Sequence, residues 1–223
     1  MKSGRPRKPQ RSDADATRSH LIEVSQELLA ERGIDGVSVS DIIAASGQRN
    51  RSAVNYHFGG KDGLIEAILE THEAQIEIRR NEMIAGIEAR GRASLRDWVR
   101  TLVMPLGELI DSPGGIAYLR IIGQLIGHPR FSVLERHREA VAAGTDGILR
   151  MLRKARQRDP ALWLSKWILV SGVLYHGLAD YAQMRQEAAS SVPLQKPEEF
   201  FDELVESIAA LIETTATTSK RAR

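Results

Sequence analysis

The sequence contains no cysteine and no long apolar run, and both absences narrow the classes of protein to which it can belong. Without cysteine, the chain can form no disulfide, no thiolate metal site and no cysteine nucleophile. The most apolar stretch, residues 162–181, is interrupted by Ser165, Lys166, His176 and Asp180, and no run reaches the roughly 18 apolar residues of a membrane span. The basic N-terminus leads into polar residues, whereas a signal peptide continues into an apolar stretch. We therefore expect a cytoplasmic protein without membrane contact.

Long stretches of alternating apolar and polar residues are also missing, whereas apolar residues recur at helical spacing along most of the chain. The sequence therefore predicts an all-α fold class. A hydrophobic fraction of 42% and a charged fraction of 27% lie in the range of ordinary globular proteins.

Positive charge is concentrated at the N-terminus, although the formal net charge of the whole chain is only +2. Residues 1–11 carry lysines and arginines but no acid, together with two prolines and a glycine. This composition buries little apolar surface and predicts a disordered basic arm over residues 1–13. The arm could be a solubilising tail. Alternatively it contacts nucleic acid, because Gly4-Arg5-Pro6-Arg7 resembles an AT-hook, whose arginines occupy narrow A·T minor grooves.

The residues after the arm predict a helix followed by a second, capped helix. The first should run from about residue 15 to residue 32, with Gly33 as its C-cap. Ser38 as N-cap and Asp41 at the third helical position form a predicted capping box. The short helix that this box opens is expected to continue through residue 46.

A polar turn and another short helix follow. Gly47 is expected to end the preceding helix, and residues 48–50 form the turn. The next helix is predicted over residues 51–58, before Gly59-Gly60 interrupts the chain again. Two short helices joined by a tight turn that contains glycine are typical of a helix-turn-helix.

In a helix-turn-helix the second helix enters the major groove of DNA with its N-terminal residues at the base edges. Here that end carries Arg49, Asn50, Arg51 and Ser52. Arginine can pair with guanine, asparagine with adenine, and serine with either base. Asn55 extends the same face by one turn. The alternative interpretation of such an isolated stretch is a solvated polar turn followed by a surface helix.

The residues around this stretch favour the DNA-binding interpretation. Val39, Ile42, Ile43 and Val54 supply a small apolar core, and no acid occurs between residues 41 and 62. We also predict phosphate contacts from three residues that follow the base-reading positions, because their side chains carry donors: Tyr56, His57 and Lys61.

Two stretches resemble the sequence pattern of tetracycline-repressor (TetR) type regulators. They are Val39-Ser40-Asp41-Ile42-Ile43-Ala44-Ala45-Ser46-Gly47 and Ala53-Val54-Asn55-Tyr56-His57-Phe58-Gly59-Gly60-Lys61-Asp62-Gly63-Leu64-Ile65. The resemblance is specific over about residues 15–70 and beyond them extends only to the number and lengths of helices. One departure is visible, since residues 47–58 are one residue longer than the commonest pattern, which shifts the assignment of single base contacts.

The resemblance implies a homodimer in which each subunit places its recognition helix in one half of an inverted-repeat operator in double-stranded DNA. By position, Ser38, Arg51-Ser52, Asn55, His57 and Lys61 match the contact sites of the family. It also implies a small-molecule effector, of unknown identity, that binds in the body and controls DNA affinity. No other cofactor and no metal are expected. Repression is the commonest habit of the family.

The expected domain organisation follows from these assignments. A helix-turn-helix DNA-binding head should occupy residues 14–62, and a helical body for effector binding and dimerisation residues 63–216, before a flexible tail at 217–223. Predicted body helices cover residues 61–90, 94–110, 114–126, 131–156, 160–188 and 198–215. The first of them joins head to body, so it is the expected lever between effector and DNA.

The last two predicted helices are the candidates for the dimer interface. Small residues at Ser171-Gly172, Gly177 and Ala179 would allow close approach, and larger side chains would supply contact area: Trp167, Leu174, Leu178 and Tyr181. An ordinary intramolecular core is the alternative. His176 and Asp180 share a helical face, where a polar pair in the interface is favoured over a metal site, because two ligands alone do not make one.

A ligand pocket should be mostly apolar with a few placed polar groups. The candidates for its lining are Trp98, Met104, Tyr118, Gln124, His128, Trp167, Tyr175 and His176. Each of them could equally belong to the core or to the dimer interface.

Two other classes of function compete with a regulator. An enzyme is not expected, because the chain lacks a glycine-rich phosphate loop, a His-Glu-x-x-His motif and a Gly-x-Ser-x-Gly motif. The remaining alternative is a DNA-architectural protein that binds without strong sequence preference. That alternative would hold if the basic arm dominated the affinity for DNA.

Overall fold

A computed structural model describes residues 11–126, 128, 160–187 and 193–221 of the chain. All regular elements in these ranges are helices, which confirms the predicted all-α class. The chain divides into two compact units, residues 1–71 and 72–223. The first ten residues of the predicted arm and the predicted helix over residues 131–156 lie outside the described residues.

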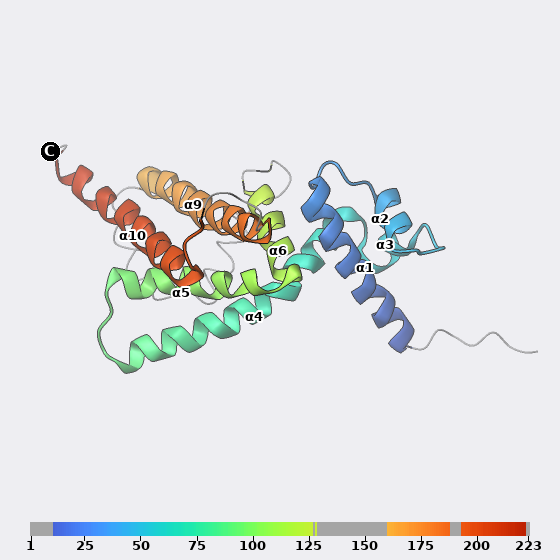
Figure 1. The fold of residues 1–223 in the computed structure, drawn as a ribbon, viewed down its shortest axis with the longest axis horizontal. Coiled ribbons are helices and arrows are strands. Elements are labelled where there is room, and N and C mark those ends of the chain that lie inside the picture. Colours follow the sequence, from blue (N-terminus) through green and yellow to red (C-terminus); the bar gives the residue numbers. More distant parts are fainter. Residues whose placement is uncertain (1–10, 127, 129–159, 188–192, 222–223) are drawn as a thin grey trace, which may run out of the picture. The chain divides into compact units, whose positions relative to one another are not determined.

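The first unit contains α1 (Arg11–Arg32), α2 (Val39–Ala45), α3 (Ala53–Phe58) and the first turns of α4 (Lys61–Ala89) (Figure 1). Two predicted bounds were wrong. Helix α1 begins at Arg11, so the last residues assigned to the arm are helical. Helix α3 begins at Ala53, which leaves Arg51 and Ser52 in the turn before it.

The core of the first unit contains three of the four apolar residues that the sequence predicted for it: Ile42 and Val54 have no exposed surface, and Ile43 is also buried. Leu21 and Leu29 of α1, which have no exposed surface either, complete this core. Val39, predicted to share this core, is only partly buried. Side chains from α1, α2 and α3 therefore form one core that holds these three helices together.

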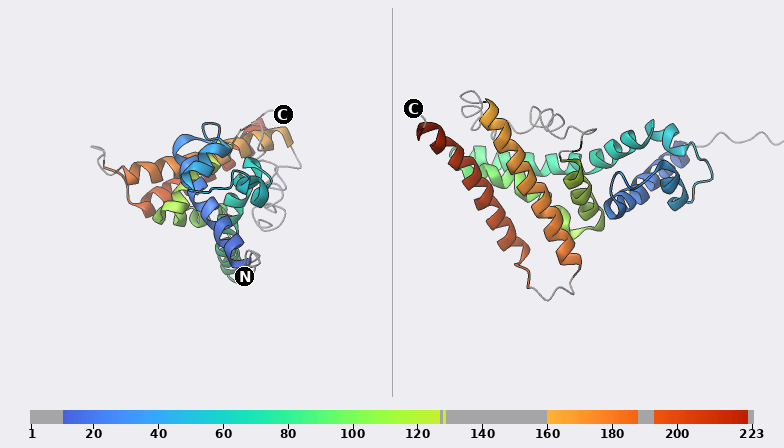
Figure 2. Two further views of the ribbon diagram at one scale, coloured as in Figure 1. Left: turned by 90° about the vertical axis from the view of Figure 1, so that its right-hand side faces the viewer. Right: turned by 90° about the horizontal axis from the view of Figure 1, so that it is seen from above.

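The second unit contains the rest of α4, then α5 (Leu95–Gly107), a short 3₁₀ helix η1 (Glu108–Asp111), α6 (Pro113–Leu125), α9 (Pro160–Gln186) and α10 (Pro197–Arg221). Helices α9 and α10 run side by side (Figure 2). Helix α10 also packs on α5, and α6 packs on α9. Helix α10 continues to residue 221, beyond its predicted end near residue 215.

A proline explains why α5 is shorter than predicted and ends in a 3₁₀ turn. Pro105 lies inside α5, and because it has no N–H it leaves the carbonyl of Thr101, four residues earlier, without its helical donor. The buried guanidinium of Arg80 replaces that donor, since its Nε donates to the Thr101 carbonyl at 3.1 Å. Arg80 is in turn paired with Glu77.

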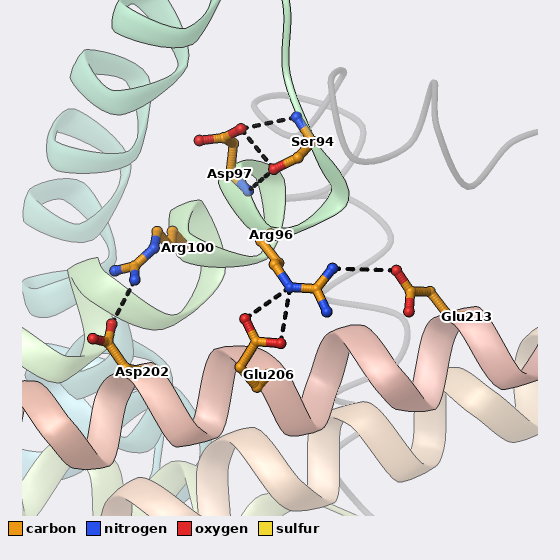
Figure 3. A network of polar contacts seen from close by, with 7 residues as sticks. All are labelled: Ser94, Arg96, Asp97, Arg100, Asp202, Glu206 and Glu213. Carbon is orange, nitrogen blue, oxygen red and sulfur yellow. Dashed lines mark hydrogen bonds and ion pairs between the residues drawn. The ribbon is translucent and has the colours of Figure 1, made fainter.

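Contacts between α5 and α10 combine a close approach with a surface ionic network (Figure 3). A Cβ atom added at Gly107 would lie only 2.9 Å from the ring of Phe201 on α10, so glycine allows the two helices to approach closely there. Arg96 is paired with Glu206 at 2.7 Å and with Glu213 at 3.4 Å. Arg100 pairs with Asp202. Exposed pairs contribute little singly, but this network fixes the register of the two helices.

None of the helices in the described ranges is both long enough and apolar enough to cross a membrane.

Candidate nucleic-acid interface

Helix α2 is fixed at its start by the predicted capping box, which the structure confirms. The backbone N–H of Ser38 donates to the Asp41 carboxylate at 2.8 Å, and the backbone N–H of Asp41 donates to the Ser38 hydroxyl at 3.2 Å. The Ser38 hydroxyl also donates to the same carboxylate at 2.5 Å. These hydrogen bonds from Ser38, through its side chain and then its backbone, lower the pKa of Asp41.

The end of α2 is held by buried polar contacts. Ser46 is the C-cap, and its hydroxyl donates to the carbonyl of Ile43 at 3.1 Å. The carbonyl of Ser46 lies 3.2 Å from Nε2 of His20 on α1. Gly47 then takes a φ of 64°, in the left-handed region that favours glycine. The chain is thereby directed away from the axis of α2 into the turn.

Asn50 organises the turn between α2 and α3. Its side-chain Oδ1 accepts from the backbone N–H of Ser52 at 3.0 Å, and its carbonyl accepts from the N–H of Ala53 at 3.1 Å. The side-chain oxygen predicted to meet a base is thus already used to set the shape of the turn. Ser52 occupies the N-cap position but makes no side-chain capping bond.

The predicted DNA-contacting residues differ in exposure. Seven of the nine are exposed: Ser38, Arg49, Asn50, Arg51, Ser52, Asn55 and Tyr56. Tyr56 shows 79% of its surface, the largest exposed fraction among the large hydrophobic side chains described. His57 and Lys61 are partly buried. The structure therefore gathers most of the predicted contact residues on the outside of α3 and of the turn before it.

Lys61 has a structural partner that the sequence did not indicate. Helix α3 ends at Gly59, whose φ of 74° is left-handed and whose N–H donates to the Asn55 carbonyl at 2.9 Å. At the following start of α4, the Lys61 ammonium donates to the carbonyl of Ile34 in the loop between α1 and α2. This bond links the start of α4 to the loop between α1 and α2, whereas a phosphate contact by Lys61 stays a prediction.

Three consecutive rings at the end of α3 lie close to one another, and the last of them contacts Arg18 of α1. Tyr56 and His57 meet edge to face with ring centroids 5.0 Å apart, and His57 and Phe58 lie 6.0 Å apart. The guanidinium carbon of Arg18 lies 5.3 Å from the centroid of the Phe58 ring. Sequence reasoning did not single out Arg18, because no local pattern links an exposed residue of α1 to a helix 40 positions later.

Two of the predicted ligand-binding residues are buried in the second unit near one stretch of α4. Tyr118 is 3% exposed and lies against the ring of His72, with centroids 4.8 Å apart. Tyr175 is also 3% exposed; burial raises its pKa, and the nearby Arg80 charge opposes that rise. Burial lowers the pKa of His72. The interior near residues 72–80 of α4 thus contains several polar groups among its apolar side chains.

The other predicted ligand residues differ in burial. Trp98, Met104, His128 and Trp167 are partly buried, and Gln124 and His176 are exposed. His176 lies against α6, because a Cβ atom added at Gly123 would be 3.4 Å from its ring. In the described part of the chain, no three histidines or carboxylates come together in a way that could hold a metal ion.

The side chains predicted to supply dimer contact area were partly wrong. Leu174, Leu178 and Tyr181 are at most 5% exposed within a single chain. Tyr181 stacks on Phe200 with centroids 4.1 Å apart, and its hydroxyl donates to the carbonyl of Gln195. The apolar residues that α9 leaves exposed are instead Ile168, Leu169, Val173 and Met184.

The described geometry defines a helix-turn-helix protein with a larger helical body, and comparison with known proteins agrees. Residues 21–68 match the family described as "Bacterial regulatory proteins, tetR family". The chain is 32% identical over 66 residues to the HTH-type transcriptional regulator AcrR of Shigella flexneri. That match spans 30% of this chain and 30% of AcrR.

Two solved structures share the fold over nearly the whole chain. One is a TetR family transcription regulator from Marinobacter aquaeolei VT8, at 14% identity and a TM-score of 0.57, covering 91% of this chain and 98% of that one. The other, from Rhodococcus sp., is described as a TetR-family transcriptional regulator, at 19% identity and a TM-score of 0.51, covering 88% and 99%. Residues 21–68 therefore resemble the DNA-binding region of that family, and the two solved structures show that the chain has their fold.

Proposed function

We propose that the protein is a sequence-specific transcriptional regulator that binds an inverted-repeat operator in double-stranded DNA as a homodimer. The observation that carries the proposal is the set of exposed polar side chains between Arg49 and Tyr56, in a helix-turn-helix whose two helices are anchored on a buried core. No acid occurs between residues 41 and 62. Arginine and asparagine on such a segment suit the edges of guanine and adenine in the major groove.

An exposed apolar stripe on α9 supports the dimer. Leu169, Val173 and Met184 lie on one helical face together with the exposed His176 and Asp180. Gly172, next to them, has open space where a side chain would be. Large apolar side chains gathered on the surface of a monomer commonly mark an interaction site. A second copy of the chain packed on this face would place two helix-turn-helix segments in one particle, as an inverted repeat requires.

We further propose that a small molecule bound in the body controls DNA affinity, and that the bound protein represses. The polar interior near residues 72–80 of α4 supports this, because Tyr118, Tyr175 and Arg80 supply buried polar groups among apolar side chains. Binding sites for small molecules combine an apolar lining with a few such groups. Helix α4 begins at Lys61, directly after α3, so a change near residues 72–80 can be passed along one helix.

The coupling between effector and DNA has a thermodynamic consequence. An effector that weakens DNA binding must bind the DNA complex more weakly than the free protein, by the same factor. An effector that bound both forms equally would contradict the proposed control.

Capture of genomic DNA tests the proposal. The purified protein is mixed with sheared genomic DNA of its host at near-physiological salt, and the bound fragments are sequenced. We expect a few discrete fragments that share an inverted repeat. The control is the double variant Arg51→Ala, Asn55→Ala, which changes only exposed side chains and should capture no discrete set.

Two outcomes would contradict sequence-specific regulation. Broad recovery of A·T-rich fragments without a shared repeat would favour the architectural alternative, in which the basic arm dominates binding. Equal capture by the wild type and the double variant would show that the segment from Arg49 to Tyr56 does not select the DNA.

A further inference from the structure

Arg18 projects from α1 onto the end of α3. Its guanidinium lies over the ring of Phe58, the last residue of α3, with 5.3 Å from the guanidinium carbon to the ring centroid. Arg18 itself is exposed, and Phe58 is partly buried. A planar guanidinium stacked on an aromatic face is held in place while its donors remain accessible. The position of the Arg18 charge is therefore set by α3 as well as by α1.

This contact extends a series of hydrogen-bond donors. The rings of Tyr56, His57 and Phe58 follow one another at centroid distances of 5.0 Å and 6.0 Å, and Arg18 lies over the last of them. The Tyr56 hydroxyl, the His57 ring and the Arg18 guanidinium all carry donors suited to phosphate oxygens. We call these four residues the aromatic–basic row. It leads from the recognition helix onto α1.

No carboxylate of the described residues neutralises the charge of Arg18. In the second unit, most described arginines pair with carboxylates: Arg79, Arg80, Arg90, Arg96, Arg100 and Arg185. Arg18, by contrast, makes no ion pair with any carboxylate of the described residues, although Asp15 lies one turn earlier on α1. An exposed arginine that is held in position and has no carboxylate partner among the described residues is suited to bind the phosphates of DNA.

We propose that Arg18 contacts a phosphate of the DNA backbone beside the bases read by the turn and α3. This inference rests on the proposed function. It adds a contact outside the segment of residues 21–68 that matches the family, and it assigns Arg18 a positioning role. Contacts to phosphate fix the register of a protein on the duplex without reading its sequence.

The test compares DNA affinity in four proteins over a range of salt concentrations. They are the wild type, Arg18→Ala, Arg18→Met and the control Arg32→Ala, which removes an exposed arginine from the last turn of the same helix. Each is titrated with a duplex carrying the captured inverted repeat and with a scrambled duplex. Arg18→Met keeps an unbranched side chain over the Phe58 ring but removes the charge. Circular dichroism melting checks that each variant is folded.

We expect both Arg18 variants to bind more weakly by a similar factor on both duplexes, so that the preference for the repeat is unchanged. The slope of log affinity against log salt should become shallower by about 0.9 for each phosphate that Arg18 no longer neutralises, and therefore by about 1.8 for a dimer. Arg32→Ala should bind as the wild type does.

Three results would overturn the inference. Wild-type binding by Arg18→Met would show that Arg18 acts only by packing on Phe58. An unchanged salt slope would show that Arg18 neutralises no phosphate in the wild-type complex, and an altered base preference would show that it reads a base instead. Absence of any preference for the repeat in the wild type would overturn the proposed function separately, and the scrambled duplex would still test Arg18.

Discussion

At the residue scale, the role of a polar side chain in the first unit depends on whether its atoms are already used within the protein. The Asn50 side chain shapes the turn, and the Lys61 ammonium bonds the Ile34 carbonyl. Arg51 and Asn55 are exposed and make no side-chain hydrogen bond with described residues. Base recognition is therefore assigned to Arg51 and Asn55 before Asn50.

Substitution of Arg51 should change sequence preference. Arg51→Ala should cost about 1–3 kcal/mol of binding free energy on the captured site, because the variant cannot form a bidentate hydrogen bond to a base. The cost should vanish when one particular base pair of the half-site is replaced. Titration of duplexes that vary each position in turn measures this. An equal cost on every duplex, scrambled ones included, would show a phosphate contact instead.

A second prediction at this scale concerns pH and stability. Burial lowers the pKa of His72, so the unfolded chain takes up a proton that the folded chain resists. Stability is then independent of this group above its ordinary pKa of about 6.5 and falls as the pH drops below that value. Urea unfolding at pH 7.5 and pH 5.5 should show a smaller difference for His72→Gln than for the wild type. The same difference in both proteins would contradict the prediction.

At the element scale, a side chain from one helix supplies a hydrogen-bond donor that a proline removes from the backbone of another helix. Pro105 deprives the Thr101 carbonyl of its donor inside α5, and Arg80 from α4 supplies one. Helices α4 and α5 are thus joined by a hydrogen bond to a carbonyl that Pro105 leaves without its helical donor. Arg80 is buried and paired with Glu77, so its removal would deprive a buried carbonyl and a partly buried carboxylate of this partner.

A double substitution tests this arrangement. Arg80→Met should destabilise the protein by about 3 kcal/mol, because it removes the partner of a buried carbonyl and of a partly buried carboxylate. Adding Pro105→Ala restores an N–H that can donate to the Thr101 carbonyl and should recover part of that stability. Chemical unfolding of the wild type, both single variants and the double variant gives the coupling. Additive effects would contradict the proposed exchange of donors.

Helix bounds in this chain were predictable where a local motif determines them. Ser38 and Asp41 cap α2, and Gly33 and Gly59 end helices in left-handed conformations, all readable from short patterns. The start of α3 was missed because the Asn50 side chain, hydrogen-bonded to the Ser52 backbone, keeps Arg51 and Ser52 in the turn. The Arg80 contact was missed because it joins residues 21 positions apart on different helices.

The faces of α9 were harder to assign for a physical reason. The helix carries apolar residues around its whole circumference, so spacing alone does not tell which side packs within the chain. The structure buries Leu174, Leu178 and Tyr181 and exposes Leu169, Val173 and Met184. The exposure of the polar residues in and after the turn was easier to predict, because charged and hydrogen-bonding residues near a turn face outward wherever a small apolar core fixes the other side.

At the scale of the whole molecule, the proposed function requires two copies of the chain. The exposed stripe on α9 is the surface proposed for that contact, and a charge introduced among its apolar side chains would be buried when the dimer forms. Leu169, which is 50% exposed in the single chain, is a suitable position to test.

Leu169→Glu should convert the dimer to a monomer and should lower the affinity for the inverted repeat much more than the affinity for a single half-site. Ile78→Glu is the matched control, because Ile78 is a large aliphatic residue of α4 that is 63% exposed and lies outside the stripe. Sedimentation velocity gives the oligomeric state of each variant. A Leu169→Glu protein that remained dimeric would show that another surface forms the dimer.

The central claim is that the segment from Arg49 to Tyr56 reads DNA sequence in two symmetric copies. Selection of binding sites by the purified protein from a pool of random duplex DNA, at near-physiological salt, tests it most directly. The account predicts enrichment of an inverted repeat with half-site centres about one helical turn, or a multiple of it, apart. Enrichment of no sequence, or of A·T-rich DNA without symmetry, would contradict it.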